Sequence, residues 1–309
     1  MKVLVLAGPT GVGKTDIAAH LARRFDLDLI SADSRQVYSW LDIGTAKPSS
    51  ELRSELRIHM VDRVEPATDY SAADYARDAL ALMRRLRREG RPFMVVGGAG
   101  LYIRALFEPF FDAPRPSEAL CRRLAAMSTD ELYGWLTRVD PQRAGELHPH
   151  DRRRIVRALE ICEMTGKSVA ELAAGVEPQS EFTPSYAVLT LPRDRLHERI
   201  DRRFDAMMSA GLLEEVRNLR AAGVIGSSRV TNTFGFAELI AHLDGALSLD
   251  QAIELAKAKT RAYARRQLTW FRKLGQALWV DNSDPARALE TLAAVQEAVL
   301  ASGRRGRCC

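Results

Sequence analysis

The chain has 309 residues, 46% of them hydrophobic, which is enough for one large domain or for one domain that carries a smaller insertion. Its net charge of +5 rests on 45 basic residues, 38 of them arginine, which is compatible with a phosphate-bearing partner and equally with an ordinary solvated surface. The four cysteines form neither a CxxC pair nor a disulfide framework, and the N-terminal apolar run is too short for a signal peptide or a membrane span. We therefore expect a cytoplasmic protein without a membrane segment. We also expect a monomer.

Short apolar runs alternate with helical patterns over the first hundred residues. We expect strands at Val3 to Ala7, Leu27 to Ala32, Ile58 to Val61 and Phe93 to Val96, with helices after the first, third and fourth. The best marked of these helices runs from about Ser71 to Arg88, and Gly90 provides the glycine that marks its C-terminal end. This alternation is typical of a doubly wound parallel α/β sheet.

The pattern changes after Asp112, where a proline-rich segment is followed by helical stretches and no strand. Helices are expected at about 117 to 126, 129 to 138 and 151 to 164, so we interpret residues 113–183 as a helical insertion domain in a core formed by 1–112 and 184–309. Tyr186 to Leu191 and Ala277 to Val280 are the expected later strands, and a helix near 248 to 274 opens with a capping box of Ser248 and Gln251.

A glycine-rich loop directly follows the first strand. Gly8-Pro-Thr-Gly-Val-Gly-Lys-Thr15 matches G-x-x-x-x-G-K-[ST] in full and precedes a helix, which is the context that the motif requires. The turn points backbone N–H groups at an anion, the lysine adds charge, and the threonine hydroxyl is placed to bind Mg²⁺. The fold class predicted is therefore a P-loop NTPase-like parallel sheet flanked by helices, with an all-helical insertion domain. The expected phosphate-binding residues are Gly8, Pro9, Thr10, Gly11, Val12, Gly13, Lys14 and Thr15.

Asp33 is the most conspicuous carboxylate near this loop. It follows the strand that ends at Ala32, and in this topology the carboxyl end of that strand opens beside the loop. A general base, a helix cap and a Mg²⁺ ligand acting through water are all compatible with this position. An ATPase or GTPase would offer a metal-binding aspartate after a later strand, for which Asp62 is the only candidate.

One signature in the sequence is highly specific. Ser31-Ala-Asp-Ser-Arg-Gln-Val-Tyr38, followed by Leu41-Asp-Ile-Gly-Thr-Ala-Lys-Pro48, resembles the tRNA dimethylallyltransferase (tRNA isopentenyltransferase) family of bacterial type. Further matches follow in order: His59 with Asp62, Tyr70-Ser-Ala-Ala-Asp74, Val95-Val-Gly-Gly98 with Leu101-Tyr102, His148-Pro149 with Asp151, Arg157-Ala-Leu-Glu160, Gly166-Lys167, and Arg-Gln-Leu-Thr-Trp-Phe within Arg261 to Arg272. Together these matches cover nearly all of residues 1–285.

The resemblance implies transfer of a dimethylallyl group from dimethylallyl diphosphate to N6 of the tRNA adenosine immediately 3′ of the anticodon, at position 37, with release of pyrophosphate. It implies Asp33 as the base, Thr10 and Arg203 as catalytic residues at the pyrophosphate, and Mg²⁺ held by Thr15. It also implies tRNA contacts from two segments. These are Asp33, Ser34, Arg35 and Gln36 in the first, and Arg153, Arg154, Ile155, Val156 and Arg157 in the second.

Several alternatives stay open at the level of sequence. Arg199 is an alternative to Arg203 for the contact with the pyrophosphate. Without the resemblance, we would expect the arginines of the segment 153–157 to form a solvated surface. Tyr38, Phe234 or Phe236 would stack on a flipped base, although core packing is the commoner fate of such aromatics. The chain departs from the family pattern at Ala99, where a threonine is usual, and between Asn232 and Ala237.

The competing functions are a small-molecule kinase or ATPase, prenylation of free adenine nucleotide, and RNA binding with an inactive phosphate loop. The intact Lys14, Thr15 and Asp33 speak against the last of these, and the basic insertion speaks against the second.

Overall fold

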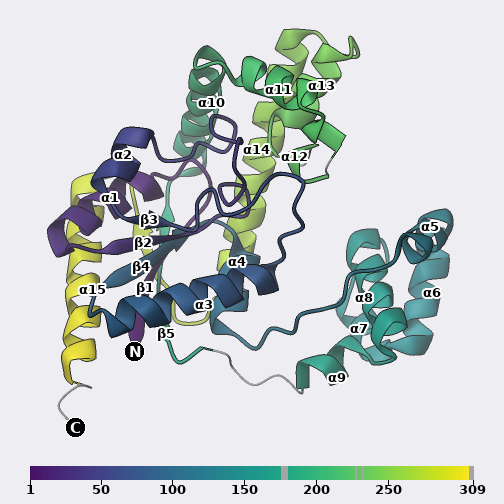
Figure 1. The fold of residues 1–309 in the computed structure, drawn as a ribbon, viewed down its shortest axis with the longest axis horizontal. Coiled ribbons are helices and arrows are strands. Elements are labelled where there is room, and N and C mark those ends of the chain that lie inside the picture. Colours follow the sequence, from purple (N-terminus) through teal and green to yellow (C-terminus); the bar gives the residue numbers. More distant parts are fainter. Residues whose placement is uncertain (175–179, 227, 232, 306–309) are drawn as a thin grey trace. The chain divides into compact units, whose positions relative to one another are not determined.

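The computed structural model describes residues 1–174, 180–226, 228–231 and 233–305. The chain divides into two compact units, one of residues 1–107 with 180–309 and one of residues 108–179. The first unit holds a sheet with the order β3-β2-β4-β1-β5-β6, in which every pairing is parallel (Figure 1). Its strands are β1 (Lys2–Ala7), β2 (Asp28–Ala32), β3 (Ile58–His59), β4 (Phe93–Gly97), β5 (Thr183–Thr190) and β6 (Leu278–Asp281).

The central strand β1 is buried on both faces. Leu4 and Leu6 belong to one core cluster with residues of α1 (Lys14–Phe25) and α15 (Pro285–Arg305). Because successive side chains of a strand point to opposite faces, the equally buried Val3 and Val5 face the other side of the sheet. Figure 1 shows α3 (Ala72–Arg88) crossing in front of the sheet, where it packs against α4 (Gly100–Phe107). Helices therefore cover both faces of the sheet.

The helices that follow β5 form a second core cluster with residues 37–41, which continue from the end of β2. Ser248 begins the longest of these helices through the predicted capping box with Gln251. Within this first unit the remaining elements are α2 (Ser50–Glu55), α10 (Arg193–Ser209), α11 (Leu212–Ala221), η1 (Val224–Gly226), α12 (Ser228–Thr231), α13 (Phe236–Leu243) and α14 (Leu249–Phe271).

The second unit is entirely helical in the part that the structure describes, and it has its own apolar core. Leu132, Leu136, Ile155 and Leu159 are fully buried in that core. Its helices are α5 (Glu118–Ala126), α6 (Thr129–Val139), α7 (Pro141–Glu146), α8 (Arg152–Thr165) and α9 (Val169–Ala174).

The predicted parallel α/β sheet flanked by helices is confirmed, and all six expected strands are present. The predicted helix from Ser71 is observed from Ala72, with Ser71 as its cap. The helical unit ends at 179 and not at 183, because Thr183 already pairs with Lys2 as the first residue of β5. It also begins five residues before the expected boundary at 113, at Glu108. Among the described residues, no helix is long and apolar enough to cross a membrane.

Candidate active site

The glycine-rich loop connects β1 to α1 at the carboxyl edge of the sheet. Gly13 has a φ of 96°, in the left-handed region that favours glycine, and a Cβ there would lie 2.7 Å from Nδ2 of Asn282. That amide nitrogen donates a hydrogen bond of 2.7 Å to the carbonyl of Val12. Asn282 follows β6, so a residue from the far end of the chain holds the loop in its turned conformation through this bond.

The Lys14 amine lies inside the loop. It donates hydrogen bonds to the carbonyl oxygens of Gly8 at 2.9 Å and of Pro9 at 2.8 Å. Burial lowers the pKa of Lys14 to about 7, an effect that Asp33 opposes and Arg203 reinforces. An arriving anion would favour the charged form of this amine, so the loop is poised to take up a proton together with its ligand.

Asp33 stands at the end of β2, as predicted, and caps the turn that follows. Its Oδ1 accepts the backbone N–H groups of Arg35 at 2.8 Å and of Gln36 at 3.3 Å. Because both bonds use Oδ1, Oδ2 is the oxygen with capacity to accept a proton from a ligand. Asp33 can therefore cap the turn with one oxygen and act as a general base with the other, so these two alternatives are compatible.

The side chain of Gln36 is built into the wall of the site. Its Nε2 donates to the carbonyls of Thr45 at 3.2 Å and Ala46 at 3.1 Å, while its Oε1 accepts from the Ser31 hydroxyl at 3.3 Å. Gln36 therefore connects β2 to the segment 41–48, and its side-chain polar groups are already partnered within the protein.

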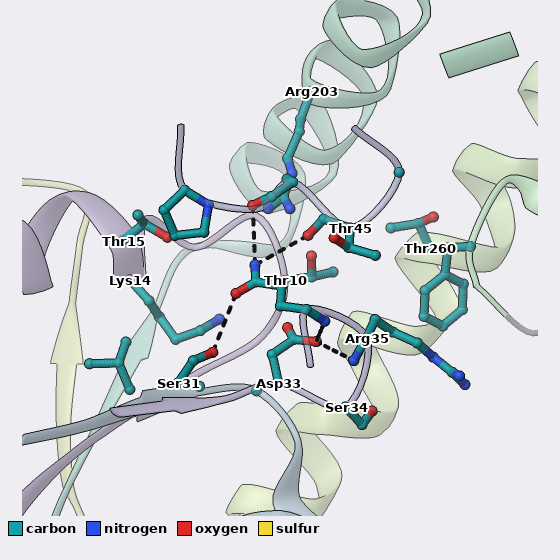
Figure 2. Close-up of a pocket in the computed structure, with 18 of the residues that line it drawn as sticks. Thr10, Lys14, Thr15, Ser31, Asp33, Ser34, Arg35, Thr45, Arg203 and Thr260 are labelled. Carbon is teal, nitrogen blue, oxygen red and sulfur yellow. Dashed lines mark hydrogen bonds between the residues drawn. The ribbon is translucent and has the colours of Figure 1, made fainter. Parts of the chain in front are cut away.

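Arg203 brings α10 to the same place. Figure 2 shows Arg203 reaching from α10 and Asp33 from the end of β2 toward one space, with Lys14 and Thr15 beside it. Burial lowers the pKa of Arg203 from its ordinary value, whereas the Asp33 carboxylate acts to raise it. A guanidinium retains its charge under any physiological condition, so Arg203 supplies a fixed positive charge opposite the loop lysine.

These residues line a cavity of about 200 Å³, which we call the first cavity. It brings together Thr10, Lys14, Thr15, Asp33, Ser34, Arg35, Gln36 and Arg203, together with apolar side chains of α1, β2, β3 and β4. The sequence prediction that the loop and Asp33 share one site is thus matched by their position in the fold.

A second cavity, of about 860 Å³, adjoins the first and is strongly basic. Lys14, Thr15 and Arg203 line both cavities, so the two meet at the loop. Gly11 and Gly13 line this second cavity from the loop, and α10 adds three more arginines, Arg195, Arg199 and Arg202. Arg199, the competitor of Arg203 at the level of sequence, faces only this second space, whereas Arg203 also faces Asp33.

The residues around the loop suit a Mg²⁺ ion that is held mainly by its ligand. Thr15 lines both cavities, while Asp33 lines the first and Asp16 the second. Among the residues that the structure describes, no group of three or more histidine, cysteine or acidic side chains could hold a metal by itself. Mg²⁺ keeps several waters and takes few protein ligands beside phosphate oxygens, so one hydroxyl and a nearby carboxylate fit it.

Comparison with known proteins decides the family. The family model described as IPP transferase matches residues 36–274. The tRNA dimethylallyltransferase 2 of Geotalea uraniireducens is 40% identical over 290 residues, covering 91% of this chain and 92% of that protein. The tRNA dimethylallyltransferase of Thermosipho africanus is 39% identical over 292 residues, covering 93% and 95%. The chain belongs to the IPP transferase family.

Solved structures agree with this assignment to the IPP transferase family. The crystal structure of the full-length tRNA isopentenylpyrophosphate transferase from Bacillus halodurans has a TM-score of 0.74 at 32% identity and covers 99% of both chains. A eukaryotic dimethylallyltransferase, captured in crystallographic snapshots while acting on tRNA, has a TM-score of 0.79 at 28% identity. That likeness covers 96% of this chain and 77% of the eukaryotic one.

The predicted tRNA-contacting segment 153–157 lies on α8 of the helical unit. Arg153 and Arg154 are exposed there, whereas Ile155 is fully buried in the core of the unit. The guanidinium of Arg157 donates to the carbonyls of residues 113 and 114 and to Glu160. Val156 packs against the same core, so the exposed basic side chains of this segment are the first two arginines, of which Arg154 also pairs with Asp151 at 3.5 Å.

The aromatic candidates separate into core and cavity residues. Tyr38 and Phe236 are buried in the core cluster of the C-terminal helices. Phe234 lines the first cavity, where its ring centroid lies 4.4 Å from that of Tyr263. Burial, followed by the charge of Asp33, raises the pKa of Tyr263 to about 12.

Of the predicted departures from the family pattern, Ala99 is buried beside the site, and Asn232 lies outside the described residues.

Several cavity residues were not predicted from the sequence. Thr260, Tyr263 and Gln267 line the first cavity from α14. The position of Gln267 could have been noticed, since it falls on the buried stripe of that helix with Ala264 and Phe271. A glutamine among apolar residues indicates a buried amide with partners elsewhere in the fold.

Proposed function

We propose that this chain transfers a dimethylallyl group from dimethylallyl diphosphate to N6 of the adenosine 3′-adjacent to the anticodon of tRNA, at position 37, and releases pyrophosphate. The observation that carries the proposal is the first cavity. It combines a phosphate loop, a carboxylate and an arginine in a member of the IPP transferase family. The names of its relatives, which are tRNA dimethylallyltransferases, support the choice of donor and acceptor.

The loop residues Gly8 to Thr15 hold the diphosphate of the donor in this proposal. Backbone N–H groups at the start of α1, the charged form of Lys14 and Arg203 supply the positive surroundings. The basic second cavity supports the same assignment, because its arginines raise the local concentration of an anionic donor next to the loop.

The reaction step is a substitution at C1 of the dimethylallyl group. The N6 lone pair forms the new bond to C1 while the bond from C1 to the diphosphate oxygen breaks, and both electrons of that bond leave with pyrophosphate. Asp33 accepts the proton that N6 loses, which general-base catalysis typically rewards by about 10²–10⁴ in rate. Thr10 and Arg203 stabilise the negative charge that develops on the leaving group.

Mg²⁺ belongs to the proposal as the cofactor. Bound at Thr15, it would neutralise charge on the diphosphate and so make that group a better leaving group. Thr15 lines both cavities, next to the space assigned to the diphosphate, which supports this choice of residue.

The tRNA is proposed to reach the first cavity with its target base turned out of the anticodon loop. Ser34 and Arg35 line the cavity next to Asp33, and Phe234 with Tyr263 offers an aromatic surface on which a purine can stack. Gln36 contributes by shaping the wall. On the helical unit, Arg153 and Arg154 are proposed to contact the phosphate backbone. The cytoplasmic location and the monomeric state stay predictions.

The proposal is tested with the purified protein, Mg²⁺ and radiolabelled dimethylallyl diphosphate, offered tRNA with adenosine at position 37 or free AMP. We expect label in tRNA and none in AMP, and nucleoside analysis should place the group on N6. The matched control is Asp33→Asn, which keeps a side-chain oxygen for the turn but cannot take up the proton.

Three outcomes would contradict the proposal. Equal labelling of AMP would indicate an enzyme that acts on free nucleotide. Turnover of ATP without transfer of label would indicate phosphoryl transfer. A near-native rate for Asp33→Asn would remove the base from its assigned role.

A further inference from the structure

Gln267 connects the phosphate loop to the end of β4 through both ends of its amide. Its Oε1 accepts the backbone N–H of Thr10 at 2.9 Å, and its Nε2 donates to the carbonyl of Gly98 at 2.8 Å. The side chain is only 7% exposed and lines the first cavity from α14. Both polar ends of the buried amide are therefore partnered, one of them by the loop itself.

The bond to Thr10 has a direct consequence for the geometry of the loop. In a phosphate loop the N–H groups usually point at the bound anion. The Thr10 N–H is instead donated to Gln267, which fixes the plane of that peptide and with it the direction of the Thr10 side chain. Thr10 lines the first cavity, and Figure 2 shows it among the residues that surround the site.

The bond to Gly98 extends the connection toward Asp33. A Cβ on Gly98 would lie 2.4 Å from Nε2 of Gln267, so the glycine makes room for the amide. The next residue, Ala99, donates its N–H to the carbonyl of Ala32 at 3.1 Å. A chain of hydrogen bonds and one short stretch of backbone therefore links Thr10 to the residue that directly precedes Asp33.

We propose that Gln267 is a positioning residue for the transfer reaction, which holds the Thr10 hydroxyl at a fixed place relative to Asp33. The inference rests on the proposed function. Thr10 then meets the leaving diphosphate on one side of the reacting carbon while Asp33 meets the amine on the other. Because the charge on the leaving group grows only as the bond breaks, correct placement of Thr10 stabilises the transition state more than the bound substrate.

The decisive variant is Gln267→Met, which keeps the length of the side chain and removes both hydrogen bonds. We expect kcat to fall about 10- to 100-fold, since a displacement on the order of 1 Å in a catalytic group can cost about 10²-fold. The KM for tRNA should change by less than about threefold. An unchanged kcat would overturn the inference.

The matched control is Trp270→Leu, one helical turn further along α14. The Trp270 ring packs against Gly100 next to the same strand end, and Trp270 is not among the residues that line either cavity. If Gln267 served only to dock α14, both variants would lower the unfolding temperature and kcat together. We expect Trp270→Leu to lower the unfolding temperature and to leave kcat within about twofold.

A double-mutant cycle with Thr10→Ala shows whether Gln267 acts through Thr10. That substitution keeps the backbone N–H but removes the hydroxyl, so in its background Gln267→Met should cost less than about threefold in kcat. Multiplication of the two single losses would contradict the inference.

The cycle is also measured on the affinity for pyrophosphate, which needs no tRNA. If the wild-type protein fails to modify tRNA, the proposed function is wrong, and the pyrophosphate cycle still tests Gln267. We then expect Gln267→Met to weaken pyrophosphate binding in the wild-type background and to have little effect beside Thr10→Ala. Equal weakening in both backgrounds would refute the role of Gln267.

Discussion

At the scale of single residues, the fold changes the pKa of Lys14 in a way that bears on ligand binding. Burial lowers its pKa to about 7, so near neutral pH a large part of the protein without ligand carries a neutral amine. The proposed diphosphate ligand would raise that pKa again because it would stabilise the ammonium form. Binding therefore takes up a proton above pH 7.

The first prediction concerns the pH dependence of pyrophosphate binding. Above pH 7 the Kd of the wild-type protein should rise by up to tenfold per pH unit, relative to Lys14→Met, until the pKa of the complex is reached. Below pH 7 the amine is already protonated, and the ratio of the two Kd values should be constant. Titration calorimetry of both proteins measures this ratio, in which the ionisation of pyrophosphate itself cancels. A constant ratio up to pH 9 would contradict the lowered pKa.

The pH dependence of folding stability has the opposite sign to the pH dependence of pyrophosphate binding. In the unfolded chain the lysine pKa returns to its ordinary value, so between pH 7 and that value the unfolded state binds more protons than the folded one. The charged amine thus costs stability below pH 7, and this cost is relieved as the pH rises through the window. The same buried amine therefore loses affinity for its ligand while the empty protein gains stability.

Individual site residues differ in how far the sequence could reveal them. The loop and Asp33 were predictable, because each lies within a short contiguous motif whose mechanism is local. Gln267 was not, because its partner Thr10 is 257 positions away along the chain. Ile155 was implied as a contact residue although it is buried, since a family match carries the position and not the orientation of the side chain.

At the scale of elements, α11 controls the segment that follows β2. The Glu215 carboxylate accepts three consecutive backbone N–H groups, from Asp42 at 2.9 Å, Ile43 at 2.7 Å and Gly44 at 2.9 Å. The segment continues through Thr45 and Ala46, which line the first cavity and bond to Gln36. One carboxylate of a distant helix thereby holds a wall of the site.

The second prediction follows from this contact. Glu215→Gln replaces the carboxylate with an amide that has one acceptor oxygen for three donors, so we expect the free energy of unfolding to fall by about 1–3 kcal/mol. The KM for the donor should rise, because the wall formed by residues 44–46 is less fixed. Denaturant unfolding and steady-state kinetics measure the two effects.

Glu214→Gln is the matched control on the same helix. Glu214 is exposed and pairs with Arg217 at 3.1 Å, so its substitution should change stability by less than about 0.5 kcal/mol. If both glutamine variants behaved alike, the contact of Glu215 with the segment would be unimportant.

The elements that the sequence predicted well are those with a long pattern. The helix from Ser71 has both a capping box and an apolar stripe, and it was placed within one residue. In contrast, α2, α7 and α9 have six residues each and had not been predicted. Six residues make fewer than two helical turns, so the period of 3.6 cannot be distinguished from a loop.

At the scale of the whole molecule, the helical unit has a core of its own and carries two neighbouring exposed arginines, Arg153 and Arg154. The core explains why Ile155 and Leu159 lie on the buried face of α8, whereas the two arginines lie on its exposed face. The number of strands was predictable from apolar runs. Their order β3-β2-β4-β1-β5-β6 was not, since it depends on which faces the long helices cover.

The third prediction concerns tRNA binding by this unit. The double variant Arg153→Ala with Arg154→Ala should weaken tRNA binding and reduce the slope of log K against log salt by about 1.5 to 2, because two phosphate contacts are lost. The KM for dimethylallyl diphosphate should stay unchanged. Filter binding at several salt concentrations measures the slope.

A control pair from neighbouring helices separates position from net charge. Arg122 of α5 and Arg138 of α6 are also exposed, so Arg122→Ala with Arg138→Ala removes the same charge from the unit. An equal change of slope in both double variants would show that only the total charge matters and would contradict a localised contact.

The central position of β1 also determines when, during synthesis of the chain, the site around the glycine-rich loop can form. β1 pairs on one side with β4, but its other neighbour, β5, is made only after the helical unit, and Asn282, which bonds to the glycine-rich loop, comes later still. The nascent chain therefore emerges with its central strand half-paired, and long-range pairing of this kind is slow. The helical unit has short-range contacts and can fold before β5 has been translated. The proposed binding of a phosphate group by the loop is thus expected only once the chain is nearly complete, although the loop is among the first residues translated.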